Sequence, residues 1–216
     1  MSDRCTLCLT LDVGSAAASR LPDVLAAALE AAPISSLTLR AADGAKMTAA
    51  IAKPLIDIAQ RKSVAALIAD DCELAKATHA DGVHISWAKD AEGAYRAARD
   101  RLGARFIVGA DAGRSRHEAM TLGEAGADYV AFGIPPHVED RAMAQSRQRQ
   151  LIAWWSEIFE IPAVAFDVVD LDHATALAAT GADFIAVTLP ATLDAAAARQ
   201  WLATYATAVA ASGQAA

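Results

Sequence analysis

The sequence predicts a (β/α)₈ barrel that occupies residues 1–216 as a single domain. Eight short apolar runs alternate with eight longer helical runs, and EAGADYVAFG (124–133) recurs as ATGADFIAVT (179–188) and, more loosely, as THADGVHIS (78–86). Eight right-handed β–α crossovers close most naturally into a barrel. A doubly wound open sheet is the alternative, but neither Gly-x-Gly-x-x-Gly nor a P-loop motif follows any of the strands.

Each predicted strand is a nearly continuous apolar run, which is typical of a parallel strand buried on both faces. The strands are expected at residues 5–12, 34–41, 64–70, 82–86, 105–111, 128–133, 162–168 and 183–189.

The segments between the strands carry apolar residues at helical spacing along one face, as helices that pack against a barrel do. Gly126 and Gly181 fit helix ends, because glycine readily adopts the left-handed conformation that follows a helix. Helices are expected up to about residue 32 and about residue 62, then at 71–79, 90–103, 115–126, around 149–159, at 170–181, and in the Ala-rich segment after 189.

Composition excludes some classes of function. A chain of 216 residues that is 55% hydrophobic suits one compact domain with a large core. The net charge of −7 and the pI of about 5.2 argue against a nucleic-acid partner, because phosphate binding needs clustered Lys and Arg. One basic stretch, Arg141 to Arg149, is short and interrupted by Ala and Gln, so we interpret it as a solvated loop or helix face.

The sequence also predicts a cytoplasmic protein with no membrane partner. No apolar run reaches the roughly 18 to 20 residues that span a bilayer, and the N-terminus lacks the pattern of a signal peptide. Cys5 and Cys8 have CxxC spacing, but residues three apart on a strand point to opposite faces. We therefore expect reduced core cysteines and no disulfide between them.

Polar residues that follow apolar strands are the main functional signal, because barrel enzymes build their sites at the C-terminal strand ends. The candidates are Asp12, Arg40, Asp70, Asp71, Ser86, Trp87, Lys89, Asp111, the loop after Gly133, Asp167, Asp170 and Thr188. Some aspartates after strands only cap the next helix. This is the expectation for Asp71, Asp90, Asp170 and Asp194. The predicted ligand-binding residues are Arg40, Asp70, His84, Trp87, Lys89, Asp111 and Asp167.

Single residues within this set carry different interpretations. Arg40 ends a strand, where its guanidinium could clamp a phosphate or a carboxylate. His84 fits a hydrogen-bonded core histidine as well as a pocket residue, and Trp87 fits a pocket wall. The five histidines show no zinc-ligand spacing, and His117 and His173, near helix starts, are expected at the surface.

At the level of whole segments the chain resembles thiamine-phosphate synthase and the related thiazole tautomerase. The resemblance covers about residues 7 to 190 and is carried by ALIADDCELAKAT (66–78), HADGVHIS (79–86), FIVGAD (106–111), HEAMTLGEAGADYVAFG (117–133), IPAVAF (161–166) and TGADFIAV (180–187). It implies a barrel that couples hydroxymethylpyrimidine diphosphate to thiazole phosphate and releases pyrophosphate, with Mg²⁺ as the cofactor.

On the side of the metal and the diphosphate, the resemblance transfers only two residues. Arg40 matches the arginine of the family's Q-x-R-x-K strand end, and Asp70 matches the metal-binding aspartate of its Asn-Asp pair. The family's glutamine, lysine and asparagine positions are occupied by Thr38, Ala42 and Ala69.

The other motifs of the family are replaced. Ser86-Trp87-Ala88-Lys89 stands where the family has Gly-Gln-x-Asp, and Asp111 stands where it has a serine. The segment GIPPHVEDRAMAQ (133–145) lacks the family's Thr-x-Thr-Lys, and Asp167-Val168 replaces a Gly-Gly pair that cradles a phosphate. The resemblance therefore implies the family's barrel with most of its catalytic and phosphate-binding residues replaced.

Four functions stay open at this point. The chain could retain the family's coupling reaction with Mg²⁺ at Asp70. It could bind a different small molecule at the rim, where one arginine, one lysine and three acids favour a zwitterion or a cation. It could be a non-catalytic paralogue that acts through the final helix or the loop 133–140. It could also be a thiazole tautomerase with His84 or His137 as the base. The sequence leaves open whether the chain forms a homo-oligomer.

Overall fold

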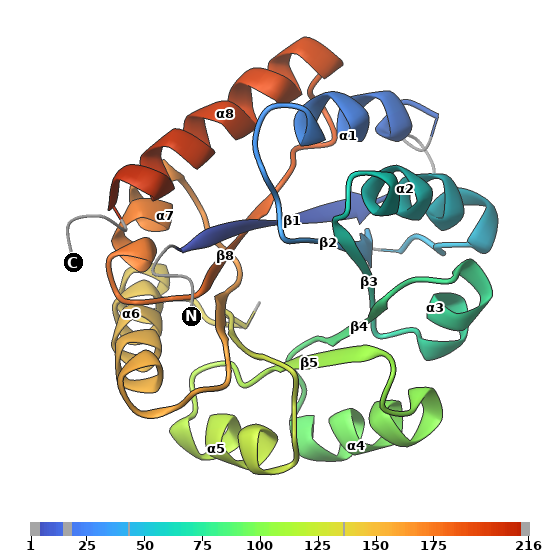
Figure 1. Ribbon diagram of the computed structural model, residues 1–216. Helices are drawn as coiled ribbons and strands as arrows, with labels where there is room; N and C mark the ends of the chain where they lie inside the picture. Colours follow the sequence, from blue (N-terminus) through green and yellow to red (C-terminus); the bar gives the residue numbers. More distant parts are fainter. Residues whose placement is uncertain (1–4, 15–18, 43, 136, 213–216) are drawn as a thin grey trace.

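The fold is seen in a computed structural model, which describes residues 5–14, 19–42, 44–135 and 137–212. Parallel strands pair in sequence order, and β8 pairs with β1, so that the sheet closes into a barrel. Helices surround the strands, one after each strand (Figure 1). The prediction of a (β/α)₈ barrel is confirmed.

The elements alternate along the described chain. The strands are β1 (Thr6–Val13), β2 (Ser36–Ala41), β3 (Ala65–Ala69), β4 (Gly82–Ile85), β5 (Ile107–Asp111), β6 (Val130–Phe132), β7 (Ala163–Ala165) and β8 (Phe184–Thr188). The helices are α1 (Leu21–Leu29), α2 (Ala49–Arg61), α3 (Cys72–Thr78), α4 (Ala91–Leu102), α5 (Arg116–Glu124), α6 (Arg141–Ile158), α7 (Leu171–Ala178) and α8 (Ala195–Ser212).

Side chains on the strands alternate between the helices and the barrel interior, as the two-residue period of a strand requires. On β1, Leu9 and Leu11 belong to the large apolar core that includes the helices. Cys8 belongs instead to a small cluster inside the barrel. This interior cluster consists of Cys8, Ala131, Val164, Phe166 and Ala186, with Tyr129 and Phe184 packed against it. These side chains fill most of the interior below the rim and leave a small apolar cavity of about 170 Å³ among them.

Three aspartates explain the recurring Ala-Asp phrases of the sequence. Each stands just before an even-numbered strand and clamps one residue at the start of the preceding strand: its carboxylate accepts that residue's N–H, and its own N–H donates to the same residue's carbonyl. The pairs are Asp81 with Ala66, Asp128 with Val108, and Asp183 with Ala163, with N–H···carboxylate distances of 2.7, 2.7 and 2.8 Å. Gly126 and Gly181 precede two of these turns with φ of +89° and +87°, as expected for glycine after a helix.

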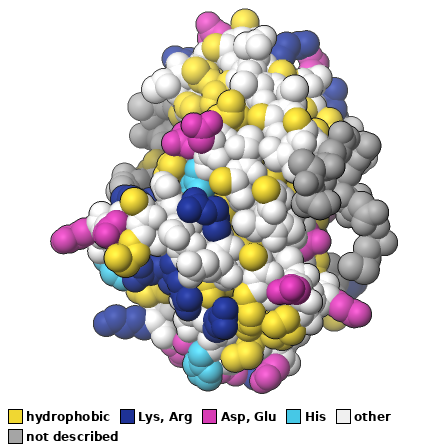
Figure 2. All heavy atoms as spheres, turned by 90° about the vertical axis from the view of Figure 1, so that its left-hand side faces the viewer, with side chains coloured by type: hydrophobic (Ala, Val, Ile, Leu, Met, Phe, Trp, Pro, Cys, Tyr) yellow, Lys and Arg dark blue, Asp and Glu magenta, His cyan; other side chains and the backbone are white. Residues whose placement is uncertain are grey.

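The helix caps follow the sequence prediction. Asp71, Asp90, Asp170 and Asp194 each accept a hydrogen bond from the backbone N–H three residues on. The sixth helix is longer than predicted, because Asp140 caps it and it begins at Arg141. The basic stretch Arg141–Arg149 therefore lies on α6. In Figure 2, which faces the side of the barrel formed by α6 and α7, basic side chains are interspersed with acidic and apolar ones.

The three cysteines are free thiols, as predicted. Cys8 is buried, whereas Cys5, expected in the core, lies just before β1 and is only partly buried. Burial raises the pKa of Cys8 to about 11 and that of Cys5 to about 12, so both are protonated at neutral pH. No helix in the described part of the chain is both long and apolar enough to cross a membrane.

The clamps predict a measurable contribution to stability. Asp183→Ala leaves the N–H of the buried Ala163 without its carboxylate, and we expect the free energy of unfolding in urea to fall by about 1–3 kcal/mol. Asp100→Ala, at an exposed position on α4, is the control and should change it by less than about 0.5 kcal/mol. Equal effects of the two substitutions would contradict a role for the clamp.

Candidate functional site

A cavity of about 940 Å³ opens at the C-terminal ends of the strands. We call it the rim cavity. It is lined by Asp12, Arg40, Ala41, Ala42, Ala69, Asp70, His84, Ser86, Trp87, Asp111, Ile134, Pro135, Arg141, Phe166 and Asp167. Six of the seven predicted ligand-binding residues line it. The seventh, Lys89, is exposed, stands next to the cap residue of α4, and lies outside the lining.

Arg40 is held by carboxylates on two sides. It pairs in register with Asp12 on the neighbouring strand, and its Nε and Nη2 donate to Asp12 Oδ1 and Oδ2 at 2.9 and 3.3 Å. Its Nη1 lies 3.6 Å from Asp167 Oδ1, beyond the end of β7. Two N–H groups of the guanidinium thus bind Asp12, Nη2 also lies 3.5 Å from the Thr188 hydroxyl, and the two carboxylates offset its charge. Arg40 is therefore not a free anion-binding group.

Asp167 stands in a backbone conformation that glycine would favour. Its φ is +54°, in the left-handed region, which aspartate tolerates better than most residues. Its Oδ2 accepts the N–H of Ile134 at 2.9 Å, while Oδ1 faces Arg40. The turn after β7 thus keeps a left-handed residue at the position where the resemblance implies glycine, and adds a carboxylate that uses both oxygens.

Asp111 is the most deeply buried acid of the cavity, with 6% of its surface exposed. Its Oδ1 accepts the N–H groups of Gly113 and Gly133 at 2.7 and 2.9 Å. Burial raises the pKa of Asp111 to about 7, with a smaller contribution from the nearby Asp167 and against the effect of the two backbone hydrogen bonds. At neutral pH this carboxyl is therefore poised between its neutral and ionised forms.

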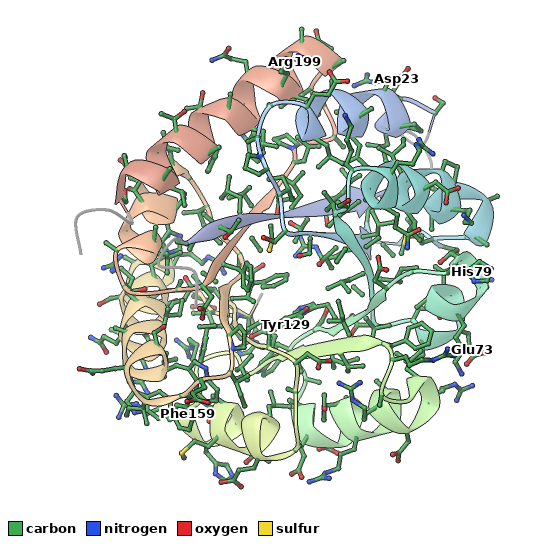
Figure 3. The ribbon with its side chains drawn as sticks, viewed as in Figure 1. Asp23, Glu73, His79, Tyr129, Phe159 and Arg199 are labelled. Atoms are coloured by element: carbon green, nitrogen blue, oxygen red, sulfur yellow. The ribbon has the colours of Figure 1, made fainter. Side chains whose placement is uncertain are left out.

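His84 lines the cavity, and Tyr129, which lies outside the lining, contacts its ring from the barrel interior. His84 is 2% exposed, its Nδ1 lies 2.9 Å from the Tyr129 hydroxyl, and its ring stacks on Phe166 with centroids 4.2 Å apart. Figure 3 shows Tyr129 within the ring of strands, whereas Glu73 and Arg199 lie on the outside. Burial, with Arg40 adding to it, lowers the pKa of His84 to about 3, so the imidazole is neutral. His84 is both a hydrogen-bonded core histidine and a wall of the cavity.

Trp87 forms one side of the cavity mouth. Its ring lies 4.8 Å from that of the exposed His137, measured between centroids. It also packs so closely on Gly113 that a β-carbon there would lie 2.5 Å from the indole. Gly113 also has a φ of +57°, so both the close indole and the left-handed backbone favour glycine at this position. The pocket wall predicted for Trp87 is thus positioned by the loop after β5.

The predicted metal ligand does not fit a protein-held Mg²⁺ centre. Asp70 is exposed and its Oδ1 accepts the N–H of Ser86 at 2.8 Å. Among the residues that the structure describes, no group of three or more His, Cys, Asp or Glu side chains converges to hold an ion. Mg²⁺ keeps several waters and is usually bound by one or two carboxylates together with the phosphates of a substrate. Asp70 would therefore be a single protein ligand for a Mg²⁺ that enters with a phosphate-bearing molecule.

Three residues were missed or misplaced by the sequence analysis. Arg141 lines the cavity. The sequence feature that could have revealed it is its position directly after the cap residue Asp140, because the first turn of a barrel helix faces the rim. Gln148 is fully buried, and its amide donates to the carbonyls of Phe132 and Phe166, joining the ends of β6 and β7. The expectation that His173 lies at the surface is wrong: it is 4% exposed, because it follows the cap of α7 on the buried side.

Comparison with known proteins supports both the barrel fold and the family resemblance seen in the sequence. The family model described as "Thiamine monophosphate synthase" matches residues 7–190. The thiamine-phosphate synthase of Rhodospirillum centenum is 38% identical over 167 residues, which cover 76% of this chain and 78% of that protein. The thiamine-phosphate synthase of Erythrobacter litoralis is 41% identical over 141 residues, which cover 64% of this chain and 65% of that protein.

A solved structure shares the fold. The thiamine phosphate pyrophosphorylase from Pyrococcus furiosus superposes with a TM-score of 0.73 over 96% of each chain, at 23% sequence identity.

The raised pKa of Asp111 predicts how stability depends on pH. Between the ordinary value of 3.8 and about 7, the folded protein keeps a proton that the unfolded chain has lost, so the free energy of unfolding falls as pH rises through this window. Asp111→Asn stays neutral and escapes this loss. In urea unfolding, its stability relative to the unsubstituted protein should rise by about 1 kcal/mol or more from about pH 4 to about pH 8. Parallel pH profiles of the two proteins would contradict the burial of an acid at this position.

Proposed function

The chain belongs to the thiamine monophosphate synthase family, and we propose that its rim cavity binds a cationic or zwitterionic organic molecule in place of a diphosphate. The observation that carries the proposal is the state of Arg40. The arginine that could clamp a phosphate is already engaged by Asp12 and Asp167. An incoming diphosphate would have to compete with two carboxylates for Arg40 and then lie beside them, and like charges repel.

The remaining charges of the cavity support the same ligand class. Among the described residues, Asp70 and Asp111 form no ion pair with a cation, and Arg141, at the start of α6, forms none with an acid. Four carboxyl groups thus face two guanidinium groups, and the field within the cavity favours positive charge. Arg141 could bind the acidic end of a zwitterion, and Trp87 and Phe166 offer apolar walls to a flat ring.

The family resemblance supports a loss of the coupling reaction. Pyrophosphate departure needs cations around the leaving group. Ala42 occupies the position of a family lysine, Lys89 lies outside the cavity, and the loop after β6 has no lysine. At the phosphate cradle, Asp167 replaces glycine and presents a carboxylate where the ligand's negative charge would lie. In this proposal the barrel keeps the family's scaffold and binds a different class of molecule.

The proposal is tested with two probes of the same shape and opposite charge. We expect benzamidine, a flat amidinium, to raise the unfolding temperature by at least about 2 °C at saturating concentration. Benzoate, its anionic counterpart, should leave that temperature unchanged. Coupling of hydroxymethylpyrimidine diphosphate to thiazole phosphate by the purified protein should stay at background. A shift with benzoate alone, or coupling above background, would overturn the proposal.

A single substitution should shift the preference of the cavity from cations towards phosphates. Asp167→Gly suits the left-handed backbone and removes one of the two carboxylates that hold Arg40. This variant should bind pyrophosphate about tenfold more tightly than the unsubstituted protein, and benzamidine more weakly. Asp100→Asn, at an exposed position on α4, is the control and should leave both affinities unchanged.

A further inference from the structure

Two carboxyl groups converge on the backbone of Gly133. A β-carbon at this glycine would lie 2.3 Å from Asp111 Oδ2 and 2.7 Å from Asp167 Oδ2. The two acids come from the ends of β5 and β7, and the glycine between them follows β6. Only glycine leaves room for both, so this strand end brings two like-charged groups together at the wall of the rim cavity.

The oxygens of this pair are not equally occupied. Asp167 uses both, one with Arg40 and one with the N–H of Ile134. Asp111 uses Oδ1 for two backbone N–H groups, and no donor among the described residues reaches its Oδ2. Asp111 is 6% exposed and lines the cavity, and its Oδ2 can accept a further hydrogen bond from a ligand there.

The surroundings decide which acid holds a proton in the empty cavity. Two carboxylates side by side in a buried site do not both ionise readily. Asp167 pairs with Arg40 of β2 and accepts a backbone N–H. Tyr129, before β6, lies near Asp111 and is protonated, and the neutral His84 of β4 and Arg141 of α6 line the same cavity. No cation forms an ion pair with Asp111 among the described residues, so the proton of the pair resides there.

We propose that Asp111 and Asp167 seat the positively charged N–H group of the ligand, and that this group replaces a proton which Asp111 holds in the empty cavity. This inference rests on the proposed function, because it names the part of the cavity that selects the cation. On binding, the Asp111 O–H bond breaks and its proton passes to the solvent. An N–H···O bond from the ligand to Asp111 Oδ2 forms in its place, and no other bond changes.

Proton release gives the inference a signature of its own. Benzamidine keeps its charge across the neutral range, so any proton released on binding comes from the protein. Calorimetric titration in two buffers with different heats of ionisation should show release of nearly one proton at about pH 6 and almost none at about pH 8.5. As pH rises towards 7, the dissociation constant of benzamidine should fall by up to about tenfold per pH unit, and above pH 7 it should level off.

Asp111→Asn tests the assignment to this residue. The amide cannot lose a proton, so we expect the variant to bind benzamidine about tenfold more weakly at about pH 8, with no proton release and no pH dependence. Asp100→Asn, on the exposed face of α4, is the matched control and should keep both the release and the pH dependence.

The outcomes separate this inference from the proposed function. Benzamidine binding without proton release, or a pH dependence that persists in Asp111→Asn, would overturn the inference and leave cation binding intact. Absence of benzamidine binding at every pH, in a protein that unfolds cooperatively, would overturn the proposed function and the inference with it.

Discussion

The character of the rim cavity depends on the ion pairs that Arg40 makes with Asp12 and Asp167. The pairing of β1 with β2 puts Arg40 beside Asp12 in register, and Asp167, in the left-handed turn after β7, lies near the same guanidinium. Because one cation is shared by two anions, the strand ends of β1, β2 and β7 form a set with surplus negative charge. Burial is the main cause of the raised pKa of Asp111, and the nearby Asp167 adds to it.

The N-terminal ends of the strands carry hydrogen bonds that stabilise the barrel, and the C-terminal ends form the rim cavity. At the N-terminal ends of the strands, Asp81, Asp128 and Asp183 clamp neighbouring strands through pairs of hydrogen bonds. At the C-terminal ends, side chains can change without loss of these clamps, which is how one barrel supports different chemistries. The proposed change of ligand therefore requires no change in the fold that this chain shares with its family.

Much of the fold and most of the predicted cavity residues could be read from the sequence, because buried parallel strands and their turns leave strong local patterns. The Ala-Asp phrases marked strand starts, and aspartates after strands marked helix caps. Side-chain positions near element ends were harder to predict. Lys89 lies outside the cavity because β4 ends at Ile85, and Arg141 lies inside it because α6 begins earlier than its apolar pattern suggested. The pairing of Asp111 with Asp167 depends on strands that are distant in sequence, so no local pattern could reveal it.

The claim that the cavity favours cations over phosphates is tested most directly by calorimetric titration of the purified protein with pyrophosphate in the presence of Mg²⁺, and with thiazole phosphate. The account predicts no measurable heat with either, which corresponds to dissociation constants weaker than about 1 mM. Binding of either phosphate with a dissociation constant near 1 μM would contradict it. Such a result would mean that Arg40 exchanges its carboxylate partners for phosphate and that the cavity still serves the family's reaction.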